Sequence, residues 1–144
     1  MATTTPAPAS PQEVPPFPVR RFTVDEYHEL MRLGVLTDDD QVELLEGWLV
    51  PKVGHNPPHD GTVALIHESL RVLLPPGWHI RVQSSMTTSD SEPEPDLAVV
   101  PGTARDYMTR HPDPREIALA VEVSDSSLSR DRLKRRIYAR ELLP

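Results

Sequence analysis

Two short apolar runs, each carrying one carboxylate, place the strongest constraint on how this chain can fold. They are DLAVV (residues 96–100) and EIALAVEV (residues 116–123). Both show the period-two alternation of β-strands, so Asp96 shares a face with Ala98, and Glu122 shares one with Ala120. If the two strands pair, the carboxylates converge over a shallow surface that the small alanine side chains leave open.

Glu122 is the more informative of the two acids. A carboxylate within an apolar strand costs several kcal/mol of desolvation unless something compensates it. An arginine partner, a sheet-edge position or a divalent cation would each do so, and the sequence leaves a structural ion pair and a functional site both open. Two hard oxygen ligands near one point suit Mg²⁺ or Mn²⁺. Such an ion activates water for phosphodiester hydrolysis, and a nearby lysine would help to orient that water.

Capping and turn signals predict the elements at the N-terminal side of these strands. Thr23 and Glu26 form a capping box for a first helix, which ends at Gly34. The stretch QVELLEGWLVPKV then predicts two short strands hinged at Glu46 and Gly47.

A second helix is predicted after Asn56, because Asn is a favoured N-cap and Pro57 suits the first helical position. Its apolar stripe consists of Val63, Ile66, Leu70, Leu73 and Leu74. The alternating WHIRVQ predicts a strand, residues 101–115 a loop with one helical turn, and residues 128–141 a last helix capped by Ser127 or Ser129.

The resulting order is helix, hairpin, helix, three strands and helix. It predicts an α/β or α+β fold in which helices flank a central mixed sheet. Trp48 and Trp78 are interpreted as core residues.

Composition narrows the class of protein. Residues 1–20 hold six of the 17 prolines and predict a disordered tail, which leaves residues 21–144 as one domain. No signal peptide is recognisable, and no apolar run approaches the roughly 20 residues of a membrane span. The absence of cysteine excludes disulfides and cysteine-based metal sites. We therefore expect a cytoplasmic protein without a membrane partner.

Charge is unevenly distributed along the chain. The formal net charge of −7 argues against a module that binds nucleic acid by bulk charge alone. The predicted last helix is nevertheless basic, with Arg130, Arg132, Lys134, Arg135, Arg136 and Arg140. This helix is either an ordinary solvated face or an edge that faces phosphates.

Four segments in this order resemble the Uma-two family of restriction-endonuclease-like proteins, which belongs to the PD-(D/E)XK nuclease superfamily. They are VELLEGWLV, the helix opening with His59, EPEPDLAVV and VEVSDSSLSRDRLKRRIYA. The likeness runs from about Arg21 to the end of the chain, and Pro95-Asp96 and the block beginning at Glu122 are its most specific elements. It implies a restriction-endonuclease-like mixed sheet flanked by helices, with the acids along one sheet edge.

The resemblance also suggests roles for single residues. Asp96 looks like the metal-binding aspartate of the PD motif, and Glu122 looks like the acid of the (D/E)XK motif. Glu43 matches an acidic position in the family's early hairpin and would complete the site for Mg²⁺ or Mn²⁺. His59 matches a helix histidine, and Lys134 matches a lysine of the helix after the second motif.

Two departures from the family pattern stand out. Ser124 occupies the position of the motif lysine, so Lys134 would have to bring its charge from the next helix. An i,i+3 pair with Asp131 is the alternative role for Lys134. Such proteins also normally continue beyond YARELLP, so we expect the last strand or strands to be lacking here. The chain would then be a fragment, a shortened member, or a protein partnered through that sheet edge.

Other polar residues suggest weaker sites. His55 and His59 in GHNPPH suggest zinc, but no third ligand lies in register. His59 is expected either to hydrogen-bond locally or to line the acidic cleft. Gln83 lies on the polar face of its strand, directed either to solvent or to the catalytic surface.

The leading hypothesis is a Mg²⁺- or Mn²⁺-dependent endonuclease that hydrolyses DNA. Asp96, Glu122 and Glu43 would hold the ion, and Lys134 would orient water or phosphate. The candidate DNA contacts are His59, Gln83, Arg130, Arg135 and Arg136. The alternative is a non-catalytic binding or assembly module of the same fold, favoured by the absent E-x-K lysine and the net negative charge. A homodimer is expected only by analogy with the superfamily.

Overall fold

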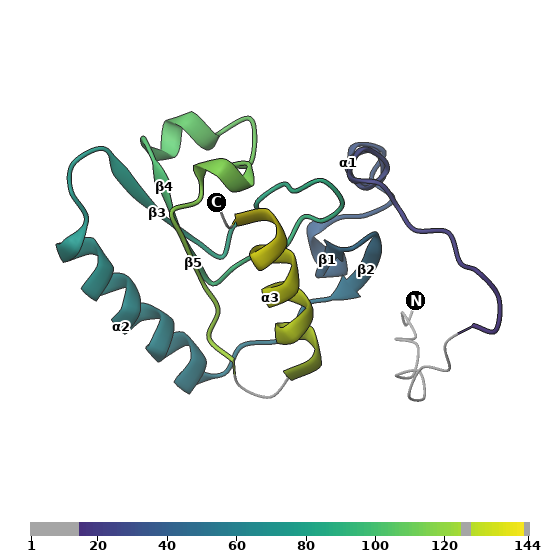
Figure 1. Ribbon diagram of the computed structural model, residues 1–144, viewed down its shortest axis with the longest axis horizontal. Coiled ribbons are helices and arrows are strands. Elements are labelled where there is room, and N and C mark those ends of the chain that lie inside the picture. Colours follow the sequence, from purple (N-terminus) through teal and green to yellow (C-terminus); the bar gives the residue numbers. More distant parts are fainter. Residues whose placement is uncertain (1–14, 125–127, 143–144) are drawn as a thin grey trace, which may run out of the picture.

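The computed structural model describes residues 15–124 and 128–142, and this part of the chain forms three α-helices and five strands (Figure 1). The elements are α1 (Val24–Arg32), β1 (Val42–Leu45), β2 (Trp48–Pro51), α2 (Pro57–Leu73), β3 (Trp78–Val82), β4 (Leu97–Pro101), β5 (Leu119–Val121) and α3 (Leu128–Leu142), with 3-10 turns at Asp38–Asp40, Ala104–Tyr107 and Pro114–Glu116. Most of the predicted Pro-rich tail and the candidate cap Ser127 lie outside the described residues.

The strands form two sheets, a hairpin of β1 and β2 and a three-stranded sheet in the order β3-β4-β5. The predicted α+β class with flanking helices is confirmed, and α2 and α3 lie on opposite sides of the three-stranded sheet (Figure 1). The strand directions differ from the prediction. A mixed sheet was expected, but every described strand pair is antiparallel. The segments that join β1 to β2, β3 to β4 and β4 to β5 each begin and end at the same end of their sheet. The strands that they join therefore run in opposite directions.

A buried strap, residues 91–95, joins the hairpin to the three-stranded sheet. Glu92 bridges to Leu44 of β1, with its amide donating to the Leu44 carbonyl at 2.7 Å. The Ser91 hydroxyl accepts from the amide of Glu46 at 2.8 Å. Pro93 and Pro95 are fully buried, so this acid-rich stretch is an internal joint that runs directly into β4.

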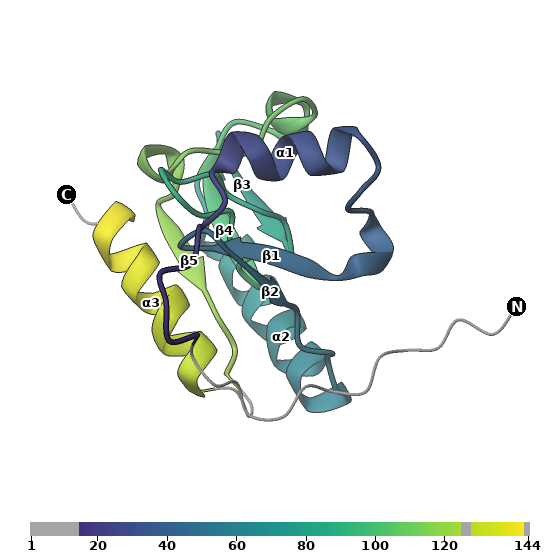
Figure 2. The ribbon, with the colours of Figure 1, turned by 90° about the vertical axis from the view of Figure 1, so that its right-hand side faces the viewer.

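The alanine-lined face of the sheet is covered, and the prediction that it lies open was wrong. Ala98 and Ala120 are paired across β4 and β5 and pack in a cluster with Tyr138 of α3. Figure 2 shows α3 running alongside β5. The small alanine side chains allow α3 to pack closely against this face, so the face is not left open to solvent. As the central strand, β4 is buried on both faces.

The predicted strand over residues 116–123 is shortened at both ends to Leu119–Val121. At its start, Asp113 caps a 3-10 turn that includes Pro114 and Glu116. The Asp113 carboxylate accepts from the Arg115 amide at 2.8 Å, and Glu116 accepts from the Asp113 amide at 2.9 Å. This local capping satisfies backbone groups that a longer strand would have used.

Several apolar residues are more exposed than the sequence predicts. Trp48 and Trp78 were expected in the core, but they are 40% and 41% exposed. Each begins a strand at a sheet edge, and the Arg21 guanidinium lies over the Trp48 ring. On α2, Val63 is buried but Leu73 is 77% exposed, so the predicted stripe is only partly covered. None of the described helices is both long and apolar enough to cross a membrane.

The hairpin hinge depends on glycine at position 47. Glu46 and Gly47 both have left-handed φ values, 48° and 81°, as a two-residue hairpin turn requires. A Cβ at Gly47 would lie 2.5 Å from the Cβ of Arg21 and 2.9 Å from the carbonyl oxygen of Phe22. Both the backbone angle and the space therefore exclude a side chain here.

We predict that Gly47→Ala lowers the free energy of unfolding by about 2–4 kcal/mol, because left-handed strain and steric overlap add. Gly34→Ala is the matched control, since Gly34 has φ 71° but open space around its Cβ position. It should lose only about 1 kcal/mol. Urea denaturation of both variants measures the difference, and equal losses would contradict the steric argument.

Candidate functional site

A cavity of about 130 Å³ lies where the hairpin, the strap, the ends of β4 and β5, and α3 meet. All four residues predicted for catalysis line it, as do three of the predicted DNA contacts. These residues are Glu43, Asp96, Glu122, Lys134, His59, Gln83 and Arg130. Arg135 and Arg136 do not line the cavity and lie exposed on α3.

Strand register brings Asp96 and Glu122 together. β4 pairs with β5 so that Leu97 faces Val121 and Ala98 faces Ala120. One residue beyond the last pair, the same register sets Asp96 opposite Glu122 on the face that the alanines share. The predicted convergence is therefore observed, at the end of the ladder where the chain leaves the sheet.

Lys134 occupies the centre of the acidic cluster. Its Nζ lies 2.6 Å from Glu122 Oε1 and 3.6 Å from Glu43 Oε2, and it donates to the Glu94 carbonyl at 2.8 Å. Lys134 is 5% exposed, so these acceptors offset the cost of burying its ammonium. Among the ion pairs of the described residues, Lys134 pairs with these glutamates and not with Asp131, its alternative partner.

Asp96 is held by a backbone amide and by a histidine. Its Oδ2 accepts from the Val123 amide at 2.8 Å and lies 3.2 Å from His59 Nε2. His59 therefore lines the cavity, one of its two expected positions. Burial lowers the pKa of His59, but the carboxylates of Asp96 and Asp60 outweigh burial, so the pKa is raised overall.

Sequence reasoning missed several residues that complete the cluster. The Glu94 amide donates to Glu43 Oε2 at 2.9 Å, and the Glu94 carboxylate pairs with Lys52 at 2.6 Å. The Tyr138 hydroxyl donates to Glu122, and burial together with Glu122 raises the pKa of Tyr138. Helical spacing held the signal for Tyr138, since a residue four positions after Lys134 lies on the same helix face.

The cavity offers carboxylates, the ligand type that a hard divalent cation binds, but among the described residues only His55, His59 and Asp60 bring three ligand atoms within 4.8 Å of one another. Five carboxylates line the cavity, at Glu43, Glu94, Asp96, Glu122 and Asp131, against three cationic side chains, Lys52, Arg130 and Lys134. Asp131 lines the same cavity, and its Oδ2 is buried without a hydrogen-bond partner among the described residues. Excess negative charge with an unsatisfied oxygen is the environment that Mg²⁺ or Mn²⁺ favours. A cation there would share the cavity with the Lys134 ammonium.

The arginines of α3 differ in how far contacts within the protein already occupy their guanidinium groups. Arg130 lines the cavity, and its guanidinium donates to the Pro51 carbonyl. Arg136 forms a bidentate pair with Glu46 at 2.7 and 3.0 Å, which neutralises its charge within the protein. Arg135 is exposed.

Burial raises the pKa of Glu122 from 4.5 to about 7, although Lys134 and Tyr138 act in the opposite direction. The unfolded chain therefore loses this proton at lower pH than the folded protein. The contribution of Glu122 to stability is full below about pH 4.5 and is lost as pH rises towards 7.

We predict that Glu122→Gln removes this pH dependence. The stability of the variant relative to the original protein should rise between pH 4.5 and 7.5, by up to about 3 kcal/mol. Chemical denaturation in metal-free buffer at several pH values measures the two curves. Parallel curves would show that the proton on Glu122 is not linked to folding.

Comparison with known proteins identifies the family of this chain. Residues 24–144 match the Uma2 family model, which is described as "Putative restriction endonuclease". No curated protein and no solved structure matches the chain significantly. The matched range contains the predicted catalytic residues Glu43, Asp96, Glu122 and Lys134. On this match, the chain belongs to the Uma2 family.

Proposed function

We propose that this chain is a Mg²⁺- or Mn²⁺-dependent endonuclease that hydrolyses DNA phosphodiester bonds. The observation that carries the proposal is the buried Lys134 ammonium, 2.6 Å from Glu122 in the cavity that Asp96 also lines. Ser124 stands at the motif position for lysine. Lys134 would supply from α3 the charge that the motif lysine would supply from the segment after β5, so the departure from the motif does not remove the ammonium.

Each residue of the cluster has a role in this proposal. Asp96 and Glu122 would hold the ion, with Glu43 as a further carboxylate. The ion, when bound, would lower the pKa of water and neutralise charge on the phosphoryl oxygens. Lys134 would orient the water or the phosphate with an ammonium that is already fixed by its buried partners. His59 would hold the Asp96 carboxylate in position through its contact with Oδ2.

DNA binding would depend on a few cations, because the net charge of −7 opposes general attraction to phosphates. Arg130 lines the cavity, and Arg135 is exposed on the same helix. The pairing of Arg136 with Glu46 makes it the weakest of the predicted DNA contacts.

A second candidate is a non-catalytic binding or assembly module of the same fold. It is favoured by the way that Lys134 already neutralises Glu122 and Glu43 within the protein. In such a module the cluster would be a buried ion-pair network that stabilises the joint between α3 and the sheets.

We predict that the protein nicks supercoiled plasmid DNA with Mg²⁺ or Mn²⁺ and loses the activity with EDTA. Asp96→Asn, Glu122→Gln and Lys134→Met should each reduce the rate at least about 100-fold, because each removes a group that contacts the ion or the reacting phosphate. Glu68→Gln is the control, since Glu68 is an exposed acid on α2. Activity that survives in the Asp96 and Glu122 variants would sink the catalytic assignment.

Mn²⁺ binding separates the two candidate functions. We expect isothermal titration to show saturable Mn²⁺ binding that Asp96→Asn and Glu122→Gln abolish and Glu68→Gln preserves. Saturable binding without nicking would leave a metal-binding but inactive protein. Absence of binding in the original protein would favour the non-catalytic module.

A further inference from the structure

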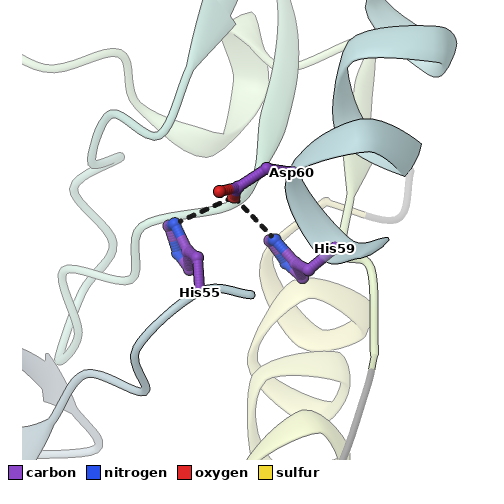
Figure 3. Close-up of side chains that lie close together, drawn as sticks. All are labelled: His55, His59 and Asp60. Carbon is purple, nitrogen blue, oxygen red and sulfur yellow. Dashed lines mark hydrogen bonds and ion pairs between the residues drawn. The ribbon is translucent and has the colours of Figure 1, made fainter. Parts of the chain in front are cut away.

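A second group of ligand atoms lies at the edge of the acidic cavity, at the start of α2, and two of its members, His55 and His59, line that cavity. His55 belongs to the segment before the helix, whereas His59 and Asp60 belong to its first turn. Nδ1 of His55 lies 3.5 Å from Asp60 Oδ1, and Nδ1 of His59 lies 3.4 Å from the same oxygen (Figure 3). The three residues offer ligand atoms that all lie within 4.8 Å of one another. Asp60 is the third ligand that sequence spacing alone did not supply.

The two separations between the Asp60 oxygen and the histidine nitrogens match those between ligands of one metal ion. An ion bound about 2.0–2.1 Å from each atom in a tetrahedral site holds neighbouring ligand atoms about 3.3–3.4 Å apart. By contrast, a good hydrogen bond from a ring nitrogen is about 2.7–3.2 Å long. One Asp60 oxygen thus faces two imidazole nitrogens at distances that are long for hydrogen bonds and suited to a shared ion.

The opposite edge of His59 is held by a carboxylate. His59 Nε2 lies 3.2 Å from Asp96 Oδ2. Histidine ligands usually donate their second N–H to a carboxylate, which leaves the other nitrogen free to bind the metal. In His59 this arrangement directs Nδ1 to Asp60. The His59 side chain is 9% exposed, so its ring is already fixed by its surroundings.

His55 is the adjustable member of the group. Its ring stacks on His59 at 4.7 Å between centroids, and the Gln83 amide lies 3.0 Å from its Nδ1. The His55 side chain is 40% exposed, so the ring can turn towards a shared ion. Gln83 competes for the same nitrogen and must release it when an ion binds.

We propose that His55, His59 and Asp60 form a binding site for a transition-metal ion of the Zn²⁺ class, with water as the fourth ligand. Two imidazole nitrogens and one carboxylate oxygen form a donor set that suits Zn²⁺ and its neighbours better than Mg²⁺. The site uses other ligands than the acids proposed to hold Mg²⁺ or Mn²⁺, although it shares their cavity and contacts Asp96 through His59, and it does not require the proposed nuclease activity. A bound ion would fix the segment before α2 to the helix and hold the His59 ring against Asp96.

Co²⁺ is the probe that tests this site, because tetrahedral Co²⁺ absorbs strongly in the visible range. We expect one equivalent of Co²⁺ to give these bands and Zn²⁺ to displace it. His55→Ala and Asp60→Asn should each weaken binding at least about 10-fold. Both residues are exposed, and thermal melts of the variants verify that they fold. Gln83→Ala should bind Co²⁺ at least as tightly, since it removes the competing amide.

Two controls separate this site from other sources of Co²⁺ binding. His67→Ala changes a histidine further along α2 and should bind Co²⁺ normally. Glu122→Gln should keep the Co²⁺ bands even though it is expected to lose Mn²⁺ binding. Bands that persist in His55→Ala and Asp60→Asn but vanish in Glu122→Gln would assign the ion to the acidic cavity and overturn the proposal. Absence of bands in the original protein would also overturn it.

Discussion

The buried ammonium of Lys134 is the interaction on which the arrangement of the site depends. It contacts Glu122 at the end of β5, Glu43 in β1 and the Glu94 carbonyl in the strap. The Glu122 carboxylate and the Glu94 carbonyl lie within hydrogen-bonding distance of the ammonium, at 2.6 and 2.8 Å, and Glu43 adds an ion pair at 3.6 Å. Without this charge, the glutamates would be buried with no cation among the described residues to compensate both of them. The same contacts attach α3 to both sheets, so folding and site assembly share one set of interactions.

The strap explains how two separate sheets can build one site. The hairpin and the three-stranded sheet share no strand, and their connection runs through the bridge between Leu44 and Glu92. In the strap, the Glu94 amide donates a hydrogen bond to the Glu43 carboxylate and so orients it. The strap is followed directly by Asp96, the residue before β4. The strap and the start of β4 are buried and hydrogen-bonded, so the backbone positions of Glu43 and Asp96 are fixed. The placement of these two acids therefore depends mainly on backbone geometry.

Much of the fold and part of the site could be predicted from local patterns. The capping box at Thr23, the hinge at Gly47 and the helix start at Asn56 depend on residues close in sequence, and all are observed. Apart from the strand directions and the length of β5, the predictions that failed concerned burial. Trp48 and Trp78 are large and apolar, but edge strands leave them exposed. The alanine face looked open because the sequence does not state which helix will cover it.

The sequence by itself determined that Asp96 shares a strand face with Ala98 and that Glu122 shares one with Ala120, because strand alternation follows from local spacing. It also determined which residue types were available for a hard cation. Only the tertiary structure decided that the two strands pair antiparallel in the register that sets the two acids opposite each other. The family resemblance already pointed to Lys134, but only the tertiary structure decided that this lysine pairs with Glu122 and Glu43 and not with Asp131, and that Asp60 joins two histidines. The physical reason is that ion pairing and ligand convergence depend on distances between segments far apart in the chain. The periodicity of a sequence predicts which face of its own helix or strand a side chain occupies. It does not predict which residue of another segment that side chain contacts.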